Sequence, residues 1–325
     1  MEALLDVAWR LLSGLGAWPA YRIVHSFPSA LQGLAYRLTR GRCPEPLGLR
    51  VKGLRAARLA NPVGLAAGLN KDGNLTWLGD ALCLGFTVVG SVLPYKYGGA
   101  GRKVLLRITP EAAINRLGLP SRGVDRVKEA VSKYETRYTT VAWNAAGLRI
   151  QDYREVVAKI GGLGAWAEVN ISCPNTEEHG TFEKPDVAVR VASTVREVSR
   201  IPLLLKIPNT DDRDLLHAYA DVVRESGMAG IVAGNTSKFY VRGVQAGLSG
   251  APIYYRVRRA VRVLRELLPG EYVVVGVGGV TRPERAVELL EEGADLVEIL
   301  TALLRLGPGR VREIVWAAWR AVGRR

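Results

Sequence analysis

The chain is poor in cysteine and has no long apolar stretch, and each shortage excludes a class of protein. Among its 325 residues there are only 3 cysteines, Cys43, Cys83 and Cys173, too few for a disulfide-stabilised scaffold; we expect free thiols and a reducing compartment. The longest apolar runs, such as 272–277, fall far short of the roughly 18–20 residues that cross a bilayer. With 48% apolar residues and no biased tract, the chain is not disordered.

Acidic residues are also scarce relative to basic ones. The chain has 45 Lys+Arg against 31 Asp+Glu, a formal net charge of +14, which raises the possibility of a nucleic-acid partner. The basic residues are dispersed, however, and the densest segment, 256–265, has apolar residues at 257, 261 and 264. That spacing predicts the solvated face of a helix, so we expect no nucleic-acid partner. Abundant arginine and few amides favour a heat-adapted protein.

Residues 1–45 differ from the rest of the chain. Apolar residues recur at helical spacing in two runs separated by a Gly- and Pro-containing turn at 14–19, which predicts a helical hairpin. This hairpin could pack on its own domain, or it could lay its apolar face on a membrane with Arg37, Arg40 and Arg42 at the headgroups. The acidic residues near the start argue against a secretion signal.

From residue 46 to 325, short apolar runs alternate with helical patterns. The predicted strands are 62–66, 86–91, 141–144, 166–171, 203–207, 230–233, 272–276 and 296–299, and helices are predicted near 74–83, 121–135, 150–161, 185–199, 211–226, 252–268, 282–292 and 309–321. Eight such units predict an α/β fold, a (β/α)8 TIM-type barrel with an N-terminal helical extension. A doubly wound sheet is the alternative, but no dinucleotide fingerprint follows the first strand. The long Gly-rich segments 92–120 and 234–250 are expected to cover the site.

Asparagines gather at the ends of the predicted strands. Five of the nine, Asn115, Asn144, Asn170, Asn175 and Asn235, lie at strand ends or in a covering segment. Barrel enzymes carry their chemistry at the C-terminal ends of the strands. Amide side chains offer paired donors and acceptors in one plane, which matches the edge of an imide or pyrimidine ring.

The last two strands predict a phosphate site. The segment 276–279, Gly-Val-Gly-Gly, and Leu300 with Thr301 precede helices and offer free backbone N–H groups. This is the usual phosphate position of a barrel. Lys206, on an otherwise apolar strand, could pair with a structural carboxylate, or it could stabilise the negative charge of a reduced flavin; we favour the second interpretation.

Cys173 lies in a loop between asparagines and next to a proline, where a thiol could act as a general base. Cys83, by contrast, is predicted to be a small apolar residue within a helix. The three histidines, His25, His179 and His217, do not group with acids or cysteines. We therefore expect no metal site and no Ser-His-Asp triad.

Taken in order, these motifs resemble the dihydroorotate dehydrogenase family of FMN-dependent barrels, which oxidise dihydroorotate to orotate in pyrimidine synthesis. The resemblance covers residues 47–322 and rests on segments 61–68, 71–73, 114–118, 170–175, 205–207, 235–236, 247–250, 276–279 and 301–302.

The resemblance implies roles for particular residues. It implies Cys173 and Lys71 as catalytic residues, Cys173 taking a proton from C5 while hydride leaves C6 for flavin N5. It implies FMN contacts from Ala67, Gly68, Lys71, Ser91, Asn144, Asn170, Lys206, Gly250, Gly279, Leu300 and Thr301. It implies dihydroorotate or orotate contacts from Lys71, Asn115, Arg116, Leu117, Gly118, Leu119, Asn170, Asn175, Asn235 and Thr236.

Within the family, the chain combines features of two classes. The extension and Arg107 resemble the membrane-associated class, which implies a membrane quinone as acceptor and peripheral attachment on the cytoplasmic side of the cell membrane. Cys173 instead matches the soluble classes, since the quinone-linked class uses serine, and Leu300 replaces a tyrosine of the quinone path. The alternatives are a soluble enzyme with another acceptor or an iron–sulfur/flavin partner subunit, a related FMN barrel acting on a uracil-type ring, and a basic nucleic-acid or membrane-surface binding protein.

Overall fold

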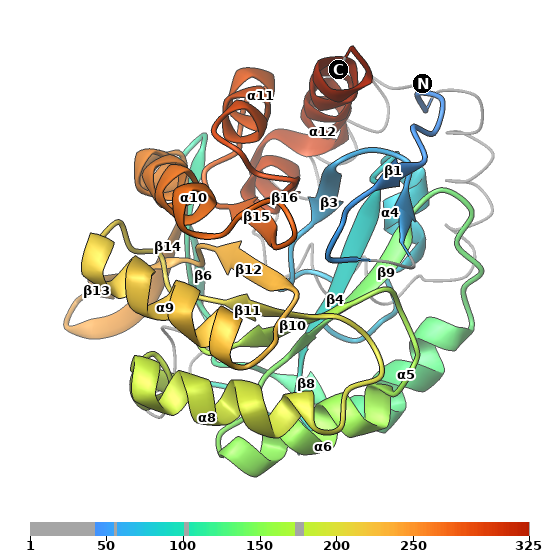
Figure 1. Cartoon of the computed structure of the whole chain (residues 1–325). Helices are drawn as coiled ribbons and strands as arrows, with labels where there is room; N and C mark the ends of the chain where they lie inside the picture. Colours follow the sequence, from blue (N-terminus) through green and yellow to red (C-terminus); the bar gives the residue numbers. More distant parts are fainter. Residues whose placement is uncertain (1–42, 55–56, 101–103, 173–178, 325) are drawn as a thin grey trace.

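The computed structural model describes residues 43–54, 57–100, 104–172 and 179–324. Eight parallel strands close a barrel, each paired with the next along the chain and the last with the first, which confirms the predicted fold class (Figure 1). The barrel strands are β3 (Val63–Leu65), β4 (Phe86–Val92), β9 (Thr140–Ala145), β10 (Ala167–Asn170), β11 (Leu203–Lys206), β12 (Gly230–Ala233), β15 (Val273–Val277) and β16 (Leu296–Ile299). Nearly all of the expected hairpin at 1–45 lies outside the described residues.

Helices surround the barrel because alternate strand residues face outward and pack on them. The two faces of each strand form two separate apolar clusters: Val88 and Leu204, for example, pack inside, while Val89 and Leu205 pack under the helices. The helices are α4 (Trp77–Ala81), α5 (Val124–Ser132), α6 (Ile150–Ile160), α7 (His179–Phe182), α8 (Pro185–Arg196), α9 (Arg213–Glu225), α10 (Tyr254–Leu267), α11 (Pro283–Glu291) and α12 (Thr301–Gly323), with a 3-10 turn η1 (Ala251–Ile253) before α10.

The N-terminal end of the barrel is closed by a short antiparallel pair, β1 (Leu49–Arg50) and β2 (Arg58–Leu59). Leu59 belongs to the same buried cluster as Phe86 and Trp166, whose rings meet edge to face with centroids 5.1 Å apart. The interior is therefore a filled core rather than a channel, and space for ligands is left at the opposite end.

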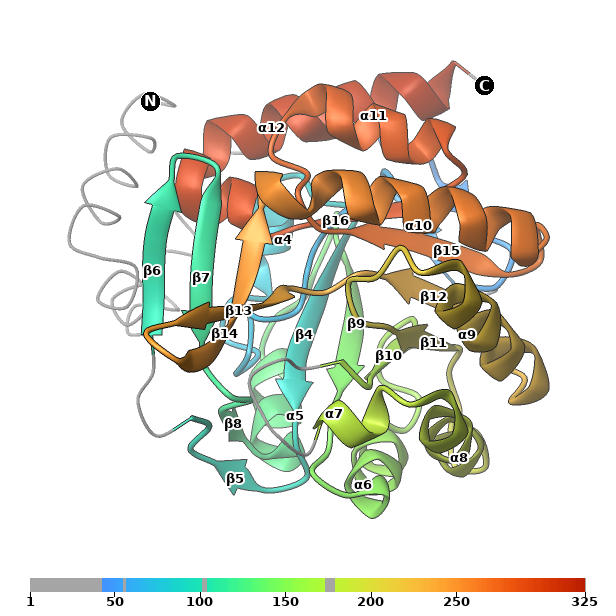
Figure 2. The same cartoon turned by 90° about the vertical axis from the view of Figure 1, so that its left-hand side faces the viewer.

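The two covering segments, 92–120 and 234–250, contain regular secondary structure in spite of their many glycines. They form a four-stranded antiparallel sheet, here called the cap sheet, in the order β13 (Ser237–Val241), β14 (Val244–Gly250), β7 (Ala112–Arg116) and β6 (Val104–Thr109). Figure 2 shows these strands standing together beside the barrel. A second small pair, β5 (Lys96–Tyr97) with β8 (Ser121–Arg122), completes this region. Backbone hydrogen bonds between segments about 130 residues apart hold this sheet together.

The final helix begins earlier than the predicted 309–321. Helix α12 starts at Thr301, directly after β16, and is interrupted by a kink at Gly307, whose φ is +86°. Pro308 follows the kink, and a proline cannot continue the hydrogen bonding of a helix, which explains why the sequence indicated a start only beyond it. The first turn of α12 is thereby placed at the end of β16.

The expectation of three free cysteines is wrong for two of them. Cys43 and Cys83 form a disulfide, with Cα atoms 5.2 Å apart. Cys83 is not inside a helix: it follows α4 with φ of +59°, a turn that aims its side chain at residue 43. Since disulfides are rare in reducing compartments outside hyperthermophiles, this pairing removes the argument for a reducing compartment.

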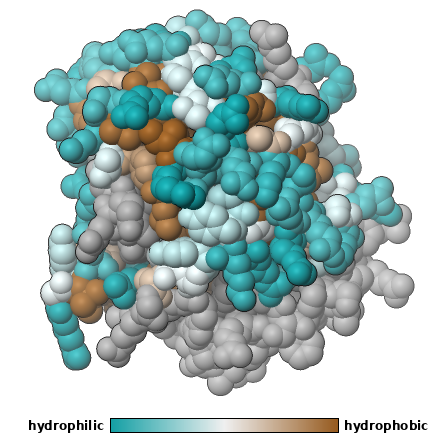
Figure 3. Space-filling model, turned by 90° about the horizontal axis from the view of Figure 1, so that it is seen from below, coloured by the Kyte–Doolittle hydropathy of each residue, from teal (hydrophilic) through white to brown (hydrophobic). Residues whose placement is uncertain are grey.

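The dense basic segment is the solvated face of α10, as predicted. Val257, Val261 and Leu264 are fully buried, while Arg258 pairs with Glu292 at 2.8 Å and Arg259 with Asp211 at 2.9 Å. On the face drawn in Figure 3, the described residues are largely hydrophilic, with smaller apolar areas between them. Across the described residues, no helix has both the length and the apolar character needed to span a bilayer.

Candidate active site

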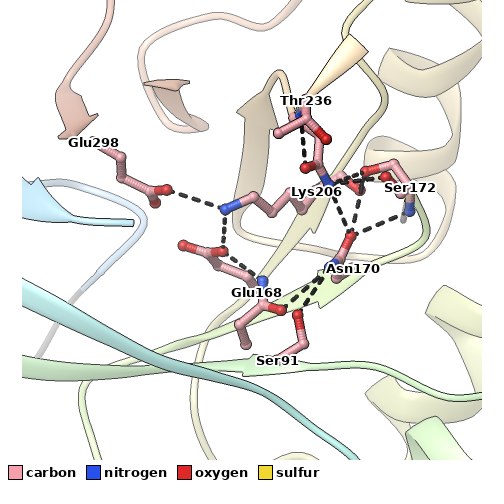
Figure 4. A network of polar contacts seen from close by, with 9 residues as sticks. Ser91, Glu168, Asn170, Ser172, Lys206, Thr236 and Glu298 are labelled. Carbon is pink, nitrogen blue, oxygen red and sulfur yellow. Dashed lines mark hydrogen bonds and ion pairs between the residues drawn. The ribbon is translucent and has the colours of Figure 1, made fainter. Parts of the chain in front are cut away.

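The predicted asparagines of the barrel strands meet in one hydrogen-bonded network at its C-terminal mouth (Figure 4). The Asn170 side-chain amide donates to Ser91 Oγ at 3.1 Å and to Asn144 Oδ1 at 3.3 Å. The Asn235 amide donates to Asn170 Oδ1 at 3.4 Å and to Ser172 Oγ at 3.0 Å. Four strands thus contribute amide and hydroxyl donors and acceptors that are held in fixed orientations.

The cap sheet brings two more predicted residues to this mouth. Asn115 on β7 donates from its amide to the carbonyl of Gly247 on β14 at 3.4 Å. Thr236 lies against the same glycine, because a Cβ built at Gly247 would collide with the Thr236 hydroxyl. Asn115 and Thr236, far apart in the sequence, therefore both lie next to a single backbone position.

The predicted backbone segment 116–119 leaves β7 at the same end. Arg116 is the last residue of β7, and the carbonyl of Leu117 accepts from Ala100 N at 2.8 Å. Leu119 is buried, and it packs with Leu93. The turn at Gly118 is therefore held between the cap sheet and the barrel.

A cavity beside the asparagine network gathers most of the residues predicted to hold a cofactor. Its lining includes Ala67, Lys206, Asn235, Thr236, Gly250, Gly279, Leu300 and Thr301. Gly68 adds to this space: a Cβ built there would meet only Leu300 Cδ1, at 4.0 Å, within 4 Å. The loop after β3 and the residue after β16 thus border an open gap.

One end of the cavity has the character of an anion site. Gly279, with φ of +73°, leaves the carboxyl end of β15, and a Cβ there would lie 2.6 Å from the Tyr254 Cβ, so the position requires glycine. Helix α12 begins at Thr301 with no side-chain cap on its free N–H groups. The Thr301 hydroxyl donates to Ser249 Oγ at 3.0 Å. Free backbone N–H groups and hydroxyls are the donors that phosphate prefers at a helix N-terminus.

Gly250 is required for a different reason. Its φ is +92°, and a Cβ there would collide with the carbonyl oxygen of Glu111. The last residue of β14 is therefore pressed against the start of β7, and any larger side chain would separate the cap sheet from the cavity.

Lys206 lies inside the barrel rather than free at the mouth. Its Nζ contacts Glu168 Oε2 at 2.8 Å and Glu298 Oε2 at 3.0 Å, and all three side chains are buried. The structure thus shows the structural ion pair that the sequence left as the less favoured interpretation. Burial alone would lower the pKa of Lys206, but the two carboxyl groups raise it above the ordinary value, so the lysine stays charged.

Lys71 lies in the loop that follows β3, and its side chain is buried. Asn70 shapes this loop: its Oδ1 accepts from Leu75 N at 3.0 Å, and its amide donates to Thr76 Oγ1 at 3.2 Å. The loop is tied to the neighbouring strand β4, since the carbonyl of Asn70 accepts from Gly90 N at 3.0 Å.

The predicted residues Cys173 and Asn175 lie outside the described residues, so their roles stay predictions. The chain just before them is well anchored. Ser172 N donates to Asn170 Oδ1 at 3.2 Å, and Ser172 Oγ contacts the carbonyl of Lys206 at 3.3 Å. The position of residue 172 at the mouth is thereby defined.

Sequence reasoning missed four polar residues of this region: Glu168, Ser172, Ser249 and Glu298. The signal for the two glutamates was available. Both lie two residues from a barrel-facing residue, Trp166 or Leu296, on strands whose other residues are mostly apolar, so their side chains must point into the barrel. The two serines lie within the motif segments 170–175 and 247–250 but gave no independent signal.

Comparison with known proteins agrees with this geometry. The family model for dihydroorotate dehydrogenase matches residues 49–317. A dihydroorotate dehydrogenase (quinone) of Aliivibrio salmonicida is 33% identical over 281 residues, 78% of this chain and 83% of the relative. The enzyme of the same name from Parvibaculum lavamentivorans is 31% identical over 310 residues, 88% of each chain.

A solved structure has the same fold. The structure of DHODH from Eimeria tenella in complex with ferulenol matches with a TM-score of 0.75 and 22% identity, covering 92% of each chain. The family model spans most of the barrel, and the curated relatives exceed 30% identity over most of both chains. The chain belongs to the dihydroorotate dehydrogenase family.

Proposed function

We propose that this protein oxidises dihydroorotate to orotate in pyrimidine synthesis, with FMN as cofactor and a membrane quinone as electron acceptor. The observation that carries this proposal is the amide network at the barrel mouth beside a cavity with an anion-binding end. A planar heterocycle would meet the amides, and a phosphate-bearing cofactor would occupy the cavity. The name of the relatives and the match to the family model support the same reaction.

The family is in general flavin-dependent, and the residues present fit FMN. The donors at Gly279 and Thr301 suit its phosphate, and the open gap over Gly68 suits a flat ring. The residues proposed to hold FMN are Ala67, Gly68, Lys71, Ser91, Asn144, Asn170, Lys206, Gly250, Gly279, Leu300 and Thr301. When bound, FMN supplies hydride acceptance at N5 and passes the electrons onward.

The substrate would lie between the amide network and the cap sheet. Lys71 would pair with its carboxylate, and Asn115, Asn170, Asn175, Asn235 and Thr236 would bind the edges of its ring. Backbone groups of Arg116, Leu117, Gly118 and Leu119 would complete the enclosure. These side chains come from opposite walls of the mouth, which favours one orientation of the ring.

Cys173 would remove the proton from C5. The C5–H bond breaks toward the thiolate sulfur while the C6–H electron pair leaves as hydride, so that a C5=C6 double bond forms and the substrate is oxidised by two electrons. Residues 170–172 would position Cys173 at the mouth, because Asn170 and Ser172 anchor the chain immediately before it.

The proposal that a quinone is the electron acceptor depends on the N-terminal extension and on Arg107 in β6. A helical hairpin of residues 1–45 touching the cytoplasmic face of the membrane would let a quinone approach the flavin from the apolar side. A cysteine base also suits a soluble enzyme with another acceptor, which is the second candidate.

The test is direct. Purified protein is expected to be yellow, to lose its flavin absorbance on addition of dihydroorotate, and to reduce a short-chain quinone with formation of orotate. A spectral shift of the flavin on adding orotate would identify the substrate. A colourless protein that binds RNA would overturn the proposal, and reaction with uracil or dihydrouridine in place of orotate would redirect it.

A further inference from the structure

Two buried carboxyl groups share one ammonium beneath the proposed flavin site. Glu168 on β10, Lys206 on β11 and Glu298 on β16 point into the barrel, and Figure 4 shows the lysine amino group between the two carboxyl groups. The three residues are 0%, 4% and 1% exposed. Lys206 and Glu298 also line the cavity that contains Gly279 and Thr301. The cluster thus belongs to the wall of the cofactor site.

The polar contacts of the two carboxyl groups are incomplete. Lys206 Nζ contacts one oxygen of each, at 2.8 and 3.0 Å, and the Asn144 amide donates to Glu168 Oε2 at 2.7 Å. The other oxygens, Glu168 Oε1 and Glu298 Oε1, are buried and accept no hydrogen bond from an amide, ammonium or hydroxyl group of the described residues. Two full carboxylates with unpaired buried oxygens would be costly, because burial disfavours charge that is not compensated.

Within the described barrel strands, the side chains that face the interior next to the cluster carry no charge. The neighbouring barrel-facing residues on the described strands are neutral: Ala66, Val88, Asn144, Val232 and Val277. With both carboxyl groups ionised, the three groups would carry one excess negative charge inside the barrel. A single proton on one carboxyl group makes the cluster neutral and gives the pair a donor.

We propose that Glu168 and Glu298 share one proton, so that the cluster is neutral and Lys206 presents no net positive charge to the flavin. The proton resides on Glu298, and Glu168 forms the ion pair with Lys206. Both glutamates are thus positioning residues that act on the flavin through Lys206. This inference rests on the proposed FMN site for its effect on the cofactor, but not for the shared proton itself.

The electrostatics of the two glutamates support this assignment. Burial, followed by the negative charge of Glu168, raises the pKa of Glu298 well above its ordinary value. Burial alone would also raise the pKa of Glu168, but the charge of Lys206 and hydrogen bonds from Glu298, Lys206 and Asn144 lower it. The pKa values of two carboxyl groups in one site move apart in this way when the two groups cannot both ionise.

As a consequence, either glutamate alone can compensate the positive charge of Lys206. If either glutamate is replaced by glutamine, the other can ionise and pair with Lys206, and the cluster stays neutral. If both are replaced, Lys206 is left as an uncompensated cation. A cation beside a flavin favours the anionic reduced form, so the midpoint potential of the flavin should rise only in the double variant.

The first experiment measures the flavin midpoint potential in the wild-type holoenzyme, E168Q, E298Q and E168Q/E298Q by spectroelectrochemical titration. Shared protonation predicts little change in each single variant and a positive shift above about 30 mV in the double variant, a tenfold change for a two-electron couple. If each single variant raises the potential and the shifts add, both carboxyl groups are ionised and the proposal fails. An unchanged double variant would also overturn it.

The second experiment detects the proton without depending on the flavin. Infrared spectra at neutral pH should show the C=O stretch of a buried protonated carboxyl group in the wild-type protein and lose it in E168Q and in E298Q. E292Q is the matched control, because the pKa of Glu292 is lowered to about 2, chiefly by its hydrogen bond with Arg262, and this group holds no proton to lose. A band that survives in either single variant overturns the proposal. A protein that binds no FMN yet shows the expected infrared changes would refute the proposed function alone.

Discussion

Cys43 and Cys83 are covalently joined, and the bond fixes the start of the described chain to the end of α4. Two further contacts hold the same segment: the Tyr138 hydroxyl donates to the carbonyl of Pro44 at 2.9 Å, and the Trp319 indole donates to that of Glu45 at 2.7 Å. The first and last parts of the described chain are therefore held together at one end of the barrel.

We expect the variant C43A/C83A to unfold more easily than the wild type. The disulfide links residues separated by 40 positions, and closing a loop of that size corresponds to about 4 kcal/mol of unfolding free energy in the chain-entropy view. Denaturant unfolding with and without reductant measures the difference. C173A is the control, since it should respond to reductant as the wild type does. Equal midpoints for wild type and C43A/C83A would contradict the prediction.

Replacing Cys173 with alanine should reduce the rate of flavin reduction by dihydroorotate by about 10²- to 10⁴-fold, the usual contribution of a general base. Flavin content and the orotate-induced spectral shift should be retained, because neither depends on the thiol. Stopped-flow reduction across a pH series checks both. Near-normal rates at every pH would remove Cys173 as the base.

Removal of residues 1–40 should impair the reduction of quinone but not the reduction of the flavin by dihydroorotate. Dihydroorotate should still reduce the flavin, because the described barrel carries the whole site proposed for that step except the 173–178 segment. Reduction of a short-chain quinone, and co-sedimentation with lipid vesicles, should both decrease. Unchanged quinone reduction in the truncated protein would favour the soluble alternative with another acceptor.

Replacing Asn170 with alanine should weaken orotate binding and lower stability by about 1–3 kcal/mol, because buried partners of its amide are left unsatisfied. Asn61→Ala is the matched control. Asn61 is equally buried and its amide donates to the carbonyl of Cys83 at 2.9 Å, but it lies at the opposite end of the barrel. It should lose stability without losing orotate affinity. Equal affinity losses in both variants would argue against a specific role for Asn170.

Glu292 links α11 to α10 through Arg262 and Arg258, and hydrogen bonding with Arg262 lowers the pKa of Glu292 to about 2. A carboxyl group with a lowered pKa stabilises the fold above its unfolded value, near 4.5, and this contribution disappears as the pH falls through 2. The melting temperature of E292Q should therefore lie below that of the wild type at neutral pH and approach it in acid. A difference that is constant with pH would contradict this.

The barrel could be predicted because apolar residues repeat with different periods along strands and along helices. Each strand lies within about two residues of its predicted range, and the paired faces, such as Val88 inside and Val89 outside, follow from simple alternation. The asparagines could be placed together for the same reason, since parallel strands end at one mouth.

The features that escaped prediction depend on contacts between distant segments. Pairing of β7 with β14 is set by backbone hydrogen bonds, and neither segment has the composition of a typical strand. The disulfide depends on the positive φ at Cys83, and the residue types around Cys83 do not predict this conformation. The ion cluster depends on three strands bringing Glu168, Lys206 and Glu298 to one level, which is a property of the closed barrel.

Because β7 pairs with β14, two proposed ligand contacts, Asn115 and Gly250, belong to one hydrogen-bonded pair of strands. Asn115 is the register partner of Gly247, and three residues further along the strand Gly250 is the partner of Ala112. A cofactor that contacts Gly250 would therefore also hold in place the strand that carries Asn115. Ligand uptake should then be ordered, with the cofactor entering first and the pyrimidine held tightly only afterwards.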